Sequence, residues 1–97
     1  MEQQDRIELV LDEGHVLILD GRVVEAFYAP NASSRRFHVE HLDAASKPKR
    51  QGGGHKFYLG KMMSGGFPDA WIVDVTDLEL IKIEEFIAIA KSRRIPR

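Results

Sequence analysis

The stretch VDVTDLELIKIEEFIAIAKSRR, residues 73–94, marks the point where the apolar pattern of the chain changes its period. Up to Val75 the apolar residues alternate or form short runs, which is typical of strands. Beyond Leu78 they recur at three- and four-residue spacing, as on one face of a helix. These positions are Leu80, Ile83, Phe86, Ile87 and Ala90. The stretch therefore predicts a last strand followed by one C-terminal amphipathic helix.

Both ends of this helix carry boundary signals. Thr76 and Glu79 have the spacing of a capping box, in which the two residues satisfy amide groups that a helix start leaves free. Acidic residues occupy the first turns and basic residues the last, the order that the helix dipole favours. Pro96 cannot continue a helix. We expect the helix over about residues 77–93, with its apolar face buried against a sheet.

The rest of the chain reads as strands joined by turns. Six segments have the alternation or the β-branched and aromatic content of strands: residues 7–11, 15–19, 22–28, 35–42, 55–59 and 70–75. Glu13-Gly14 predicts a tight turn, and Asp20-Gly21 is a strong two-residue hairpin signal. The first three strands are therefore expected to form an antiparallel meander. Phe57 and Leu59 are expected to face the core, and Trp71, Val73 and Val75 share one face of the last strand.

Two segments are expected as loops, and two others leave a choice. Residues 30–34 read as a loop and 47–54 as a basic, glycine-rich loop. The segment 35–42 also fits a helix, because Phe37 and His41 are four residues apart, but its composition favours a strand. The sequence does not decide whether residues 43–51 contain a further strand.

Length and composition indicate one domain over residues 1–97, with 43% hydrophobic and 30% charged residues. No window is long and apolar enough to span a bilayer, and the N-terminus lacks the pattern of a signal peptide. The sequence contains no cysteine, which excludes disulfides and agrees with a cytoplasmic location.

The formal net charge of −1 hides a segregation of charge along the chain. Residues 1–34 hold seven acids and two bases, whereas residues 35–61 hold seven bases and two acids. The overall balance argues against bulk affinity for nucleic acid, while the middle third is able to form a local basic surface.

The order of these elements resembles a bacterial pleckstrin-homology-like (PH-like) domain over residues 6–94. The resemblance lies in the meander of short strands, the segment SSRRFHVEHLDAA, a hairpin with a glycine-rich tip, one more strand and the terminal helix. It implies a mainly β fold, in which two near-orthogonal antiparallel sheets form a partly open β-barrel capped by the helix. The family has seven strands, and six are evident here.

The basic, glycine-rich segment 47–61 is a candidate anion-binding site. It contains five bases and no acid, and consecutive glycines can direct backbone amides toward one point. The candidate residues are Lys47, Lys49, Arg50, Gly53, His55, Lys56 and Lys61. The alternative is a solvated hairpin tip, in which glycine supplies turn conformations and lysine supplies solubility.

Metal binding and catalysis have little support in the sequence. On a strand, His38 and Glu40 would share one face and His41 would lie on the other, so too few ligands for zinc would gather. The serines sit in no nucleophile pattern. Acid–base pairs form in space rather than in sequence, but no catalytic constellation points to a reaction. We expect a non-enzymatic protein without a metal or cofactor.

Two further ligand classes can be weighed from the residues. Within the resemblance, phosphoinositides bind at the loop between the first two strands, which is here Leu11-Asp12-Glu13-Gly14-His15; its acids would repel a phosphorylated headgroup. Phe57 and Tyr58 beside Lys56 and Lys61 could stack bases. A single cluster of this kind is thin evidence, and the sequence contains no nucleic-acid-binding motif to support it.

The sequence therefore predicts a protein-interaction or scaffold module that binds a protein partner or self-associates. Met62, Met63 and Phe67 are a candidate partner contact, because methionine repacks readily against different surfaces. The alternative function is an anion-binding module that uses segment 47–61 to hold an acidic lipid or a nucleic acid.

Overall fold

The computed structural model describes residues 6–61 and 70–95 and contains two antiparallel sheets and one C-terminal helix. The first sheet has the strand order β1-β2-β3-β4 and the second the order β5-β6-β7. The elements are β1 (Arg6–Val10), β2 (His15–Asp20), β3 (Val23–Tyr28), β4 (Ser33–His38), β5 (Leu42–Pro48), β6 (His55–Lys61), β7 (Trp71–Val75) and α1 (Asp77–Ser92). The predicted fold class, mainly β with a terminal helix, is confirmed.

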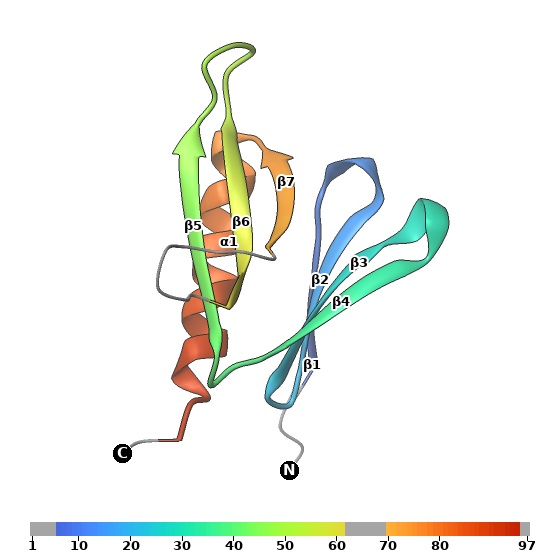
Figure 1. Cartoon of the computed structure of the whole chain (residues 1–97), viewed down its shortest axis with the longest axis vertical. Helices are drawn as coiled ribbons and strands as arrows, with labels where there is room; N and C mark the ends of the chain where they lie inside the picture. Colours follow the sequence, from blue (N-terminus) through green and yellow to red (C-terminus); the bar gives the residue numbers. More distant parts are fainter. Residues whose placement is uncertain (1–5, 62–69, 96–97) are drawn as a thin grey trace.

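The helix α1 lies along one face of the second sheet, and the first sheet stands beside both (Figure 1). The β5–β6 hairpin projects beyond the other elements. In the described residues no hydrogen-bonded strand pair joins the two sheets, so they do not close into a barrel. Within those residues no helix is both long and apolar enough to cross a membrane.

The predicted helix and its cap are confirmed. The Thr76 hydroxyl accepts a hydrogen bond from the Glu79 amide at 3.1 Å, and the Glu79 carboxylate accepts one from the Thr76 amide at 2.9 Å. The five apolar positions that the sequence assigned to one helix face are all buried. This face packs into a single core with side chains from both sheets.

Both sheets contribute to that core. The first sheet supplies the buried residues Leu17, Leu19, Val24 and Ala26, and the second supplies Phe57, Leu59, Trp71, Val73 and Val75. The inward faces predicted for residues 57–59 and 71–75 are therefore confirmed. His15 lies between the sheets, stacked on Tyr28 at 4.6 Å between ring centroids and edge-on to Trp71 at 5.7 Å.

The prediction of one strand over residues 35–42 is wrong. β4 ends at His38, residues 39–41 form a turn, and β5 starts at Leu42. The turn is fixed by partners that are distant in the sequence. The Val39 amide donates to the Arg22 carbonyl at 3.0 Å, and the Arg94 side chain donates to the carbonyl oxygens of Val39 and Leu42.

Residues 33–34 and 47–48, which the sequence assigns to loops, belong to strands β4 and β5. Ser33 and Ser34 belong to β4, where they pair with Tyr28 and Phe27, because pairing continues to the end of β3. The sequence leaves residues 43–51 undecided. The structure places most of this segment in β5, which raises the number of strands in the described part of the chain to seven. Alanine, aspartate, lysine and proline in β5 have low strand propensity, so only pairing with β6 defines it.

Polar contacts hold α1 to the first sheet at both ends. Near its start, the Glu79 carboxylate accepts a hydrogen bond from the Asp12 amide at 2.9 Å. Near its end, the Arg93 guanidinium donates to the Gly21 carbonyl at 2.7 Å. The Arg22 guanidinium also lies 2.6 Å from the Glu40 carboxylate. The helix therefore fixes the turn between β2 and β3 and the turn before β5.

Two isoleucines of α1 offer a test of this core. Ile83 is 0% exposed and Ile81 is 55% exposed. We expect Ile83→Ala to lower the free energy of unfolding by about 2–5 kcal/mol, because it leaves a cavity between the sheets. Ile81→Ala should change it by no more than about 0.5 kcal/mol. Urea unfolding of both variants checks this, and equal losses would show that the buried face of α1 does not hold the core.

Candidate functional site

Four of the candidate anion-binding residues line one hollow at the β5–β6 hairpin. The hollow has a volume of about 470 Å³ and is lined by Lys47, Pro48, Lys49, Arg50, Gln51, Lys56 and Tyr58. Lys47 and Lys56 lie opposite each other in the strand pairing. The Lys47 ammonium lies 5.5 Å from the centre of the Tyr58 ring. Among the described residues, the hollow therefore combines four cationic side chains with one aromatic ring and no lining acid.

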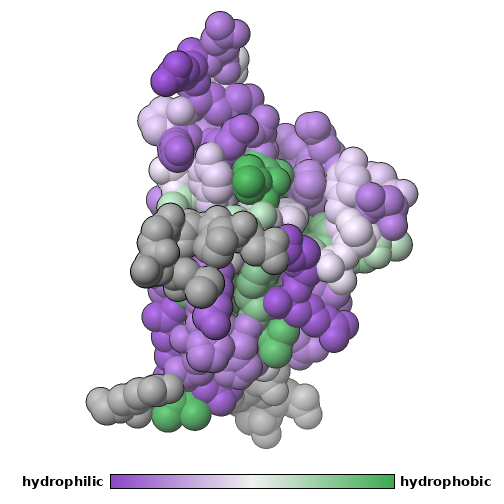
Figure 2. Space-filling model, viewed as in Figure 1, coloured by the Kyte–Doolittle hydropathy of each residue, from purple (hydrophilic) through white to green (hydrophobic). Residues whose placement is uncertain are grey.

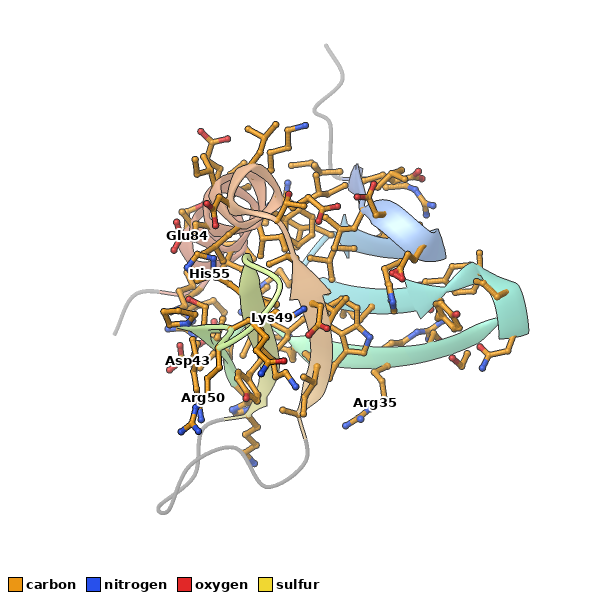
Figure 3. The ribbon with its side chains drawn as sticks, turned by 90° about the horizontal axis from the view of Figure 1, so that it is seen from above. Arg35, Asp43, Lys49, Arg50, His55 and Glu84 are labelled. Carbon is orange, nitrogen blue, oxygen red and sulfur yellow. The ribbon has the colours of Figure 1, made fainter. Side chains whose placement is uncertain are left out.

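The other three candidates do not line this hollow. Figure 3 shows Lys49, Arg50 and His55 around the hairpin, while Arg35 of β4 lies apart on the other sheet. The His55 Nδ1 atom lies 3.1 Å from an Asp77 carboxylate oxygen, on the helix side. Lys61 ends β6, far along the strand from the tip. Met62, Met63 and Phe67, the candidate partner contact, lie outside the described residues.

Gly53 lines a different hollow, with the opposite charge. This hollow, of about 390 Å³, is lined by Gly52, Gly53 and Gly54, by five carboxylate residues and by one cation, Lys49. The carboxylates are Asp12, Glu13, Asp74, Asp77 and Glu79. Such a field repels an anion, so the charge around the glycines counts against their use as an anion cradle. Anion binding by segment 47–61 stays a prediction, and its favourable part is the basic hollow.

Gly54 has a structural reason to be glycine. Its φ is +74°, and a Cβ atom there would lie 2.6 Å from the Val75 carbonyl oxygen. Its own carbonyl accepts a hydrogen bond from the Lys49 amide at 3.1 Å, which closes the hairpin loop. The backbone of this loop therefore runs directly against the end of β7.

The relative positions of His38 and His41 differ from those predicted from the sequence. Because residues 39–41 form a turn, His38 and His41 are not on opposite strand faces, and their ring centroids are 6.2 Å apart. The His38 Nδ1 atom accepts a hydrogen bond from the Glu40 amide at 3.2 Å. The Glu40 carboxylate binds Arg22 and the Ile95 amide, each at 2.6 Å. Among the described residues no three His, Cys, Asp or Glu side chains gather as metal ligands would.

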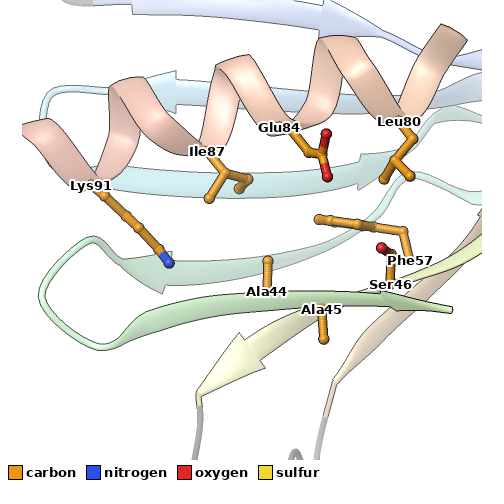
Figure 4. A pocket seen from close by; sticks show the side chains of 8 residues that line it. All are labelled: Ala44, Ala45, Ser46, Phe57, Leu80, Glu84, Ile87 and Lys91. Atoms are coloured by element: carbon orange, nitrogen blue, oxygen red, sulfur yellow. The ribbon is translucent and has the colours of Figure 1, made fainter.

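A groove that the sequence interpretation missed lies between β5 and α1 (Figure 4). It has a volume of about 160 Å³ and is lined by Ala44, Ala45, Ser46, Phe57, Leu80, Glu84, Ile87 and Lys91. Its apolar part comes from Phe57, Leu80 and Ile87, while Glu84 and Lys91 bring opposite charges to it. β5 is an edge strand of its sheet, so the groove runs beside an open strand edge.

The backbone of this edge can be assigned from the hairpin register. The Lys49 amide bonds to the Gly54 carbonyl and continues the pairing of Lys47 with Lys56. Since hydrogen-bonded pairs alternate along an antiparallel ladder, the odd-numbered residues of β5 bond to β6. The even-numbered residues, Leu42 to Pro48, direct their backbone groups to the open edge.

Part of that edge is already occupied. The Leu42 carbonyl accepts a hydrogen bond from the Arg94 side chain. The Ala44 amide donates to the carboxylate of the neighbouring residue Asp43 at 2.9 Å, and Pro48 has no amide proton. Such features protect edge strands from indiscriminate pairing. Among residues 6–61 and 70–95, the Leu42 amide, the Ala44 carbonyl, both backbone groups of Ser46 and the Pro48 carbonyl have no hydrogen-bond partner, and those of Ala44 and Ser46 lie directly beside the groove.

The helix spacing contained a signal for this groove. Leu80, Glu84, Ile87 and Lys91 follow one another at intervals of four, three and four residues, so they share one stripe of α1. The sequence alone could not show that this stripe borders an edge strand, because β5 itself was not evident.

No protein-family model, curated protein or solved structure matches this chain in the comparisons with known proteins. The candidate sites therefore rest on their geometry.

An ion pair at the end of the groove generates a pH prediction. The Lys91 ammonium lies 2.9 Å from the Asp43 carboxylate, and the two side chains are 39% and 36% exposed. The hydrogen bond from Lys91, followed by that from the Ala44 amide, lowers the pKa of Asp43 below its ordinary value of 3.8. Because the folded pKa is the lower one, the stabilisation is present above pH 3.8 and is lost as the pH falls through the folded pKa.

We therefore expect Asp43→Asn to lower the free energy of unfolding near neutral pH by less than about 1 kcal/mol, given this exposure. The difference from the unmodified protein should disappear in strongly acidic buffer. Urea unfolding across acidic and neutral pH measures it, with Glu85→Gln on the exposed side of α1 as control. A difference that persisted in acid would show that the ion pair is not its cause.

The hairpin tip generates a second prediction. Gly53 and Gly54 have similar φ values of +71° and +74°, but only Gly54 has a close neighbour. We expect Gly53→Ala to cost about 1 kcal/mol for its left-handed backbone, and Gly54→Ala to cost at least about 1 kcal/mol more through the clash with β7. Thermal and urea unfolding compare the two. Equal costs would mean that the end of β7 moves aside freely.

Proposed function

We propose that this protein is a non-enzymatic protein-interaction module that binds an extended segment of a partner protein at the open edge of β5. The observation that carries this proposal is that the Ala44 carbonyl and both backbone groups of Ser46, which bond to no other described residue, lie at the apolar groove beside α1. An extended segment that adds to a sheet edge gains affinity from main-chain hydrogen bonds and specificity from side-chain pockets. The absence of cysteine agrees with a cytoplasmic module.

The arrangement of elements supports a PH-like fold for this module. Seven strands followed by one C-terminal helix, in two antiparallel sheets, is the order that the resemblance implies. In the proposed PH-like fold the two sheets are nearly orthogonal and form the halves of a partly open barrel, and α1 covers the gap between them. The edge of β5 is then one of the openings of that barrel.

The groove defines the side chains that such a segment would carry. A cavity of about 150 Å³ lined by aliphatic and aromatic side chains holds a benzene-sized molecule, so this groove of about 160 Å³ accepts one leucine or phenylalanine side chain. Because side chains alternate along a strand, the residues two places before and after would face Glu84 and Lys91. A segment with one apolar residue flanked by charges of opposite sign matches this surface.

The same edge could be covered by a second copy of the chain. The acidic first third and basic middle third of the sequence are complementary in charge. The short open stretch of β5, limited by Pro48 and by the Arg94 contact to Leu42, offers few hydrogen bonds to a second β5 strand. We therefore assign the site to a partner segment and treat self-association as an outcome of the test.

Ser46 allows a sharp experiment, because its amide faces the open edge and not β6. A random seven-residue peptide library displayed on phage would be selected against the unmodified protein, and the selected peptide measured by calorimetry. We expect an apolar residue between charged ones. Ser46→Pro should weaken binding about tenfold or more by removing the amide proton, and Ser46→Ala should bind normally because it keeps the amide.

Three results would contradict the proposal. The library yields no binding peptide, the Ser46→Pro variant binds the selected peptide as tightly as the unmodified protein, or titration with the peptide shifts amide resonances outside residues 42–48 and 80–91. Sedimentation equilibrium is the companion measurement. A dimer that Ser46→Pro dissociates would replace the partner segment by a second copy.

A further inference from the structure

The second sheet has a face opposite α1, and this face carries the basic hollow. Strand alternation brings Lys47, Lys56 and Tyr58 to it, because their neighbour Phe57 is buried toward the helix. Tyr58 pairs across the sheet with Ile72, which is 51% exposed. Figure 2 views the molecule from this direction and shows hydrophilic residues covering the projecting hairpin. The face thus joins a basic upper part to the half-buried Tyr58 and the exposed Ile72.

The cationic side chains around this hollow differ in whether a nearby carboxylate offsets their charge. The Lys49 ammonium lies 3.3 Å from the Asp74 carboxylate, which offsets its charge. Lys47, Arg50 and Lys56 have no acidic residue among the described side chains that line the hollow with them, although Lys56 also lies opposite Asp74 in the strand pairing. Three cations around one ring form a surface of the kind that tracks a phosphate backbone while a base stacks on the ring.

Two features of the hairpin tip argue against a membrane-binding surface. The loop residues 49–54 contain no apolar side chain that could enter a bilayer. On their other side they border the hollow with five carboxylates, which an anionic membrane approaching the tip would also meet. A single strand that runs along β5 and β6 would meet the three cations and Tyr58 and would stay away from β7, which carries Asp74.

We infer that this face binds single-stranded nucleic acid, with phosphates at Lys47, Arg50 and Lys56 and a base stacked on Tyr58. The inference is independent of the proposed function, because the β5 groove faces α1 on the opposite side of the same sheet. It also revises the sequence argument on Phe57 and Tyr58. The structure separates them, leaving one ring in the core and one on the surface.

Fluorescence anisotropy with a labelled oligothymidine of about ten nucleotides tests the inference. Three phosphate contacts predict that log K falls with log salt with a slope of about −2. We expect Tyr58→Ala to weaken binding about tenfold, the loss of one stacked base, and Tyr58→Phe to bind normally. Lys47→Glu should weaken binding and flatten the salt slope.

Lys82→Glu is the matched control, since it makes the same charge change at an exposed position of α1 on the far side of the sheet. It should leave binding unchanged. Circular dichroism confirms that each variant is folded. The inference is overturned if the oligonucleotide does not bind at low salt, if Lys82→Glu weakens binding as much as Lys47→Glu, or if Tyr58→Ala binds normally. Binding to phosphatidylserine vesicles without binding to the oligonucleotide would assign the surface to membranes instead.

Discussion

The burial of one face of α1 between two unconnected sheets is the constraint on which this structure depends. No strand pairing joins the sheets in the described residues, so the side chains from Leu80 to Ala90 supply the apolar surface that both share. Removal of that surface from water is the main favourable term in folding. A sheet of four strands and one of three would each expose an apolar face without the helix. The last element of the chain therefore organises all the earlier ones.

Polar contacts at the two ends of α1 turn this general attraction into one geometry. Glu79 both completes the helix cap and accepts the Asp12 amide, so the helix start and the β1–β2 turn are fixed together. Arg93 and Arg94 bind carbonyl oxygens of the turns at Gly21 and Val39. Burial alone is non-directional, whereas these hydrogen bonds require specific positions. They set where β5 begins, and thereby place its open edge beside the helix.

The second sheet presents two chemically different surfaces because a strand alternates its side chains. Residues of β5 and β6 that point to α1 form an apolar groove with a free backbone edge, and their neighbours form a basic face around Tyr58. The glycine-rich tip belongs to neither, since it borders carboxylates from β7, α1 and the β1–β2 turn. A segment that looks uniformly basic in the sequence is thus divided by the fold into an acidic side and a basic side.

The sequence by itself determined the helix, its cap, its buried stripe and the inward faces of β6 and β7, because these depend on periodicity and on contacts within a few residues. Only the tertiary structure decided that β5 is a strand, that the chain turns at residues 39–41, and which lysines share a hollow. The segment of β5 has weak strand propensity and is defined by its pairing with β6. The turn is held by Arg22 and Arg94, which are remote in the chain. Charge environments likewise depend on neighbours that only folding brings together.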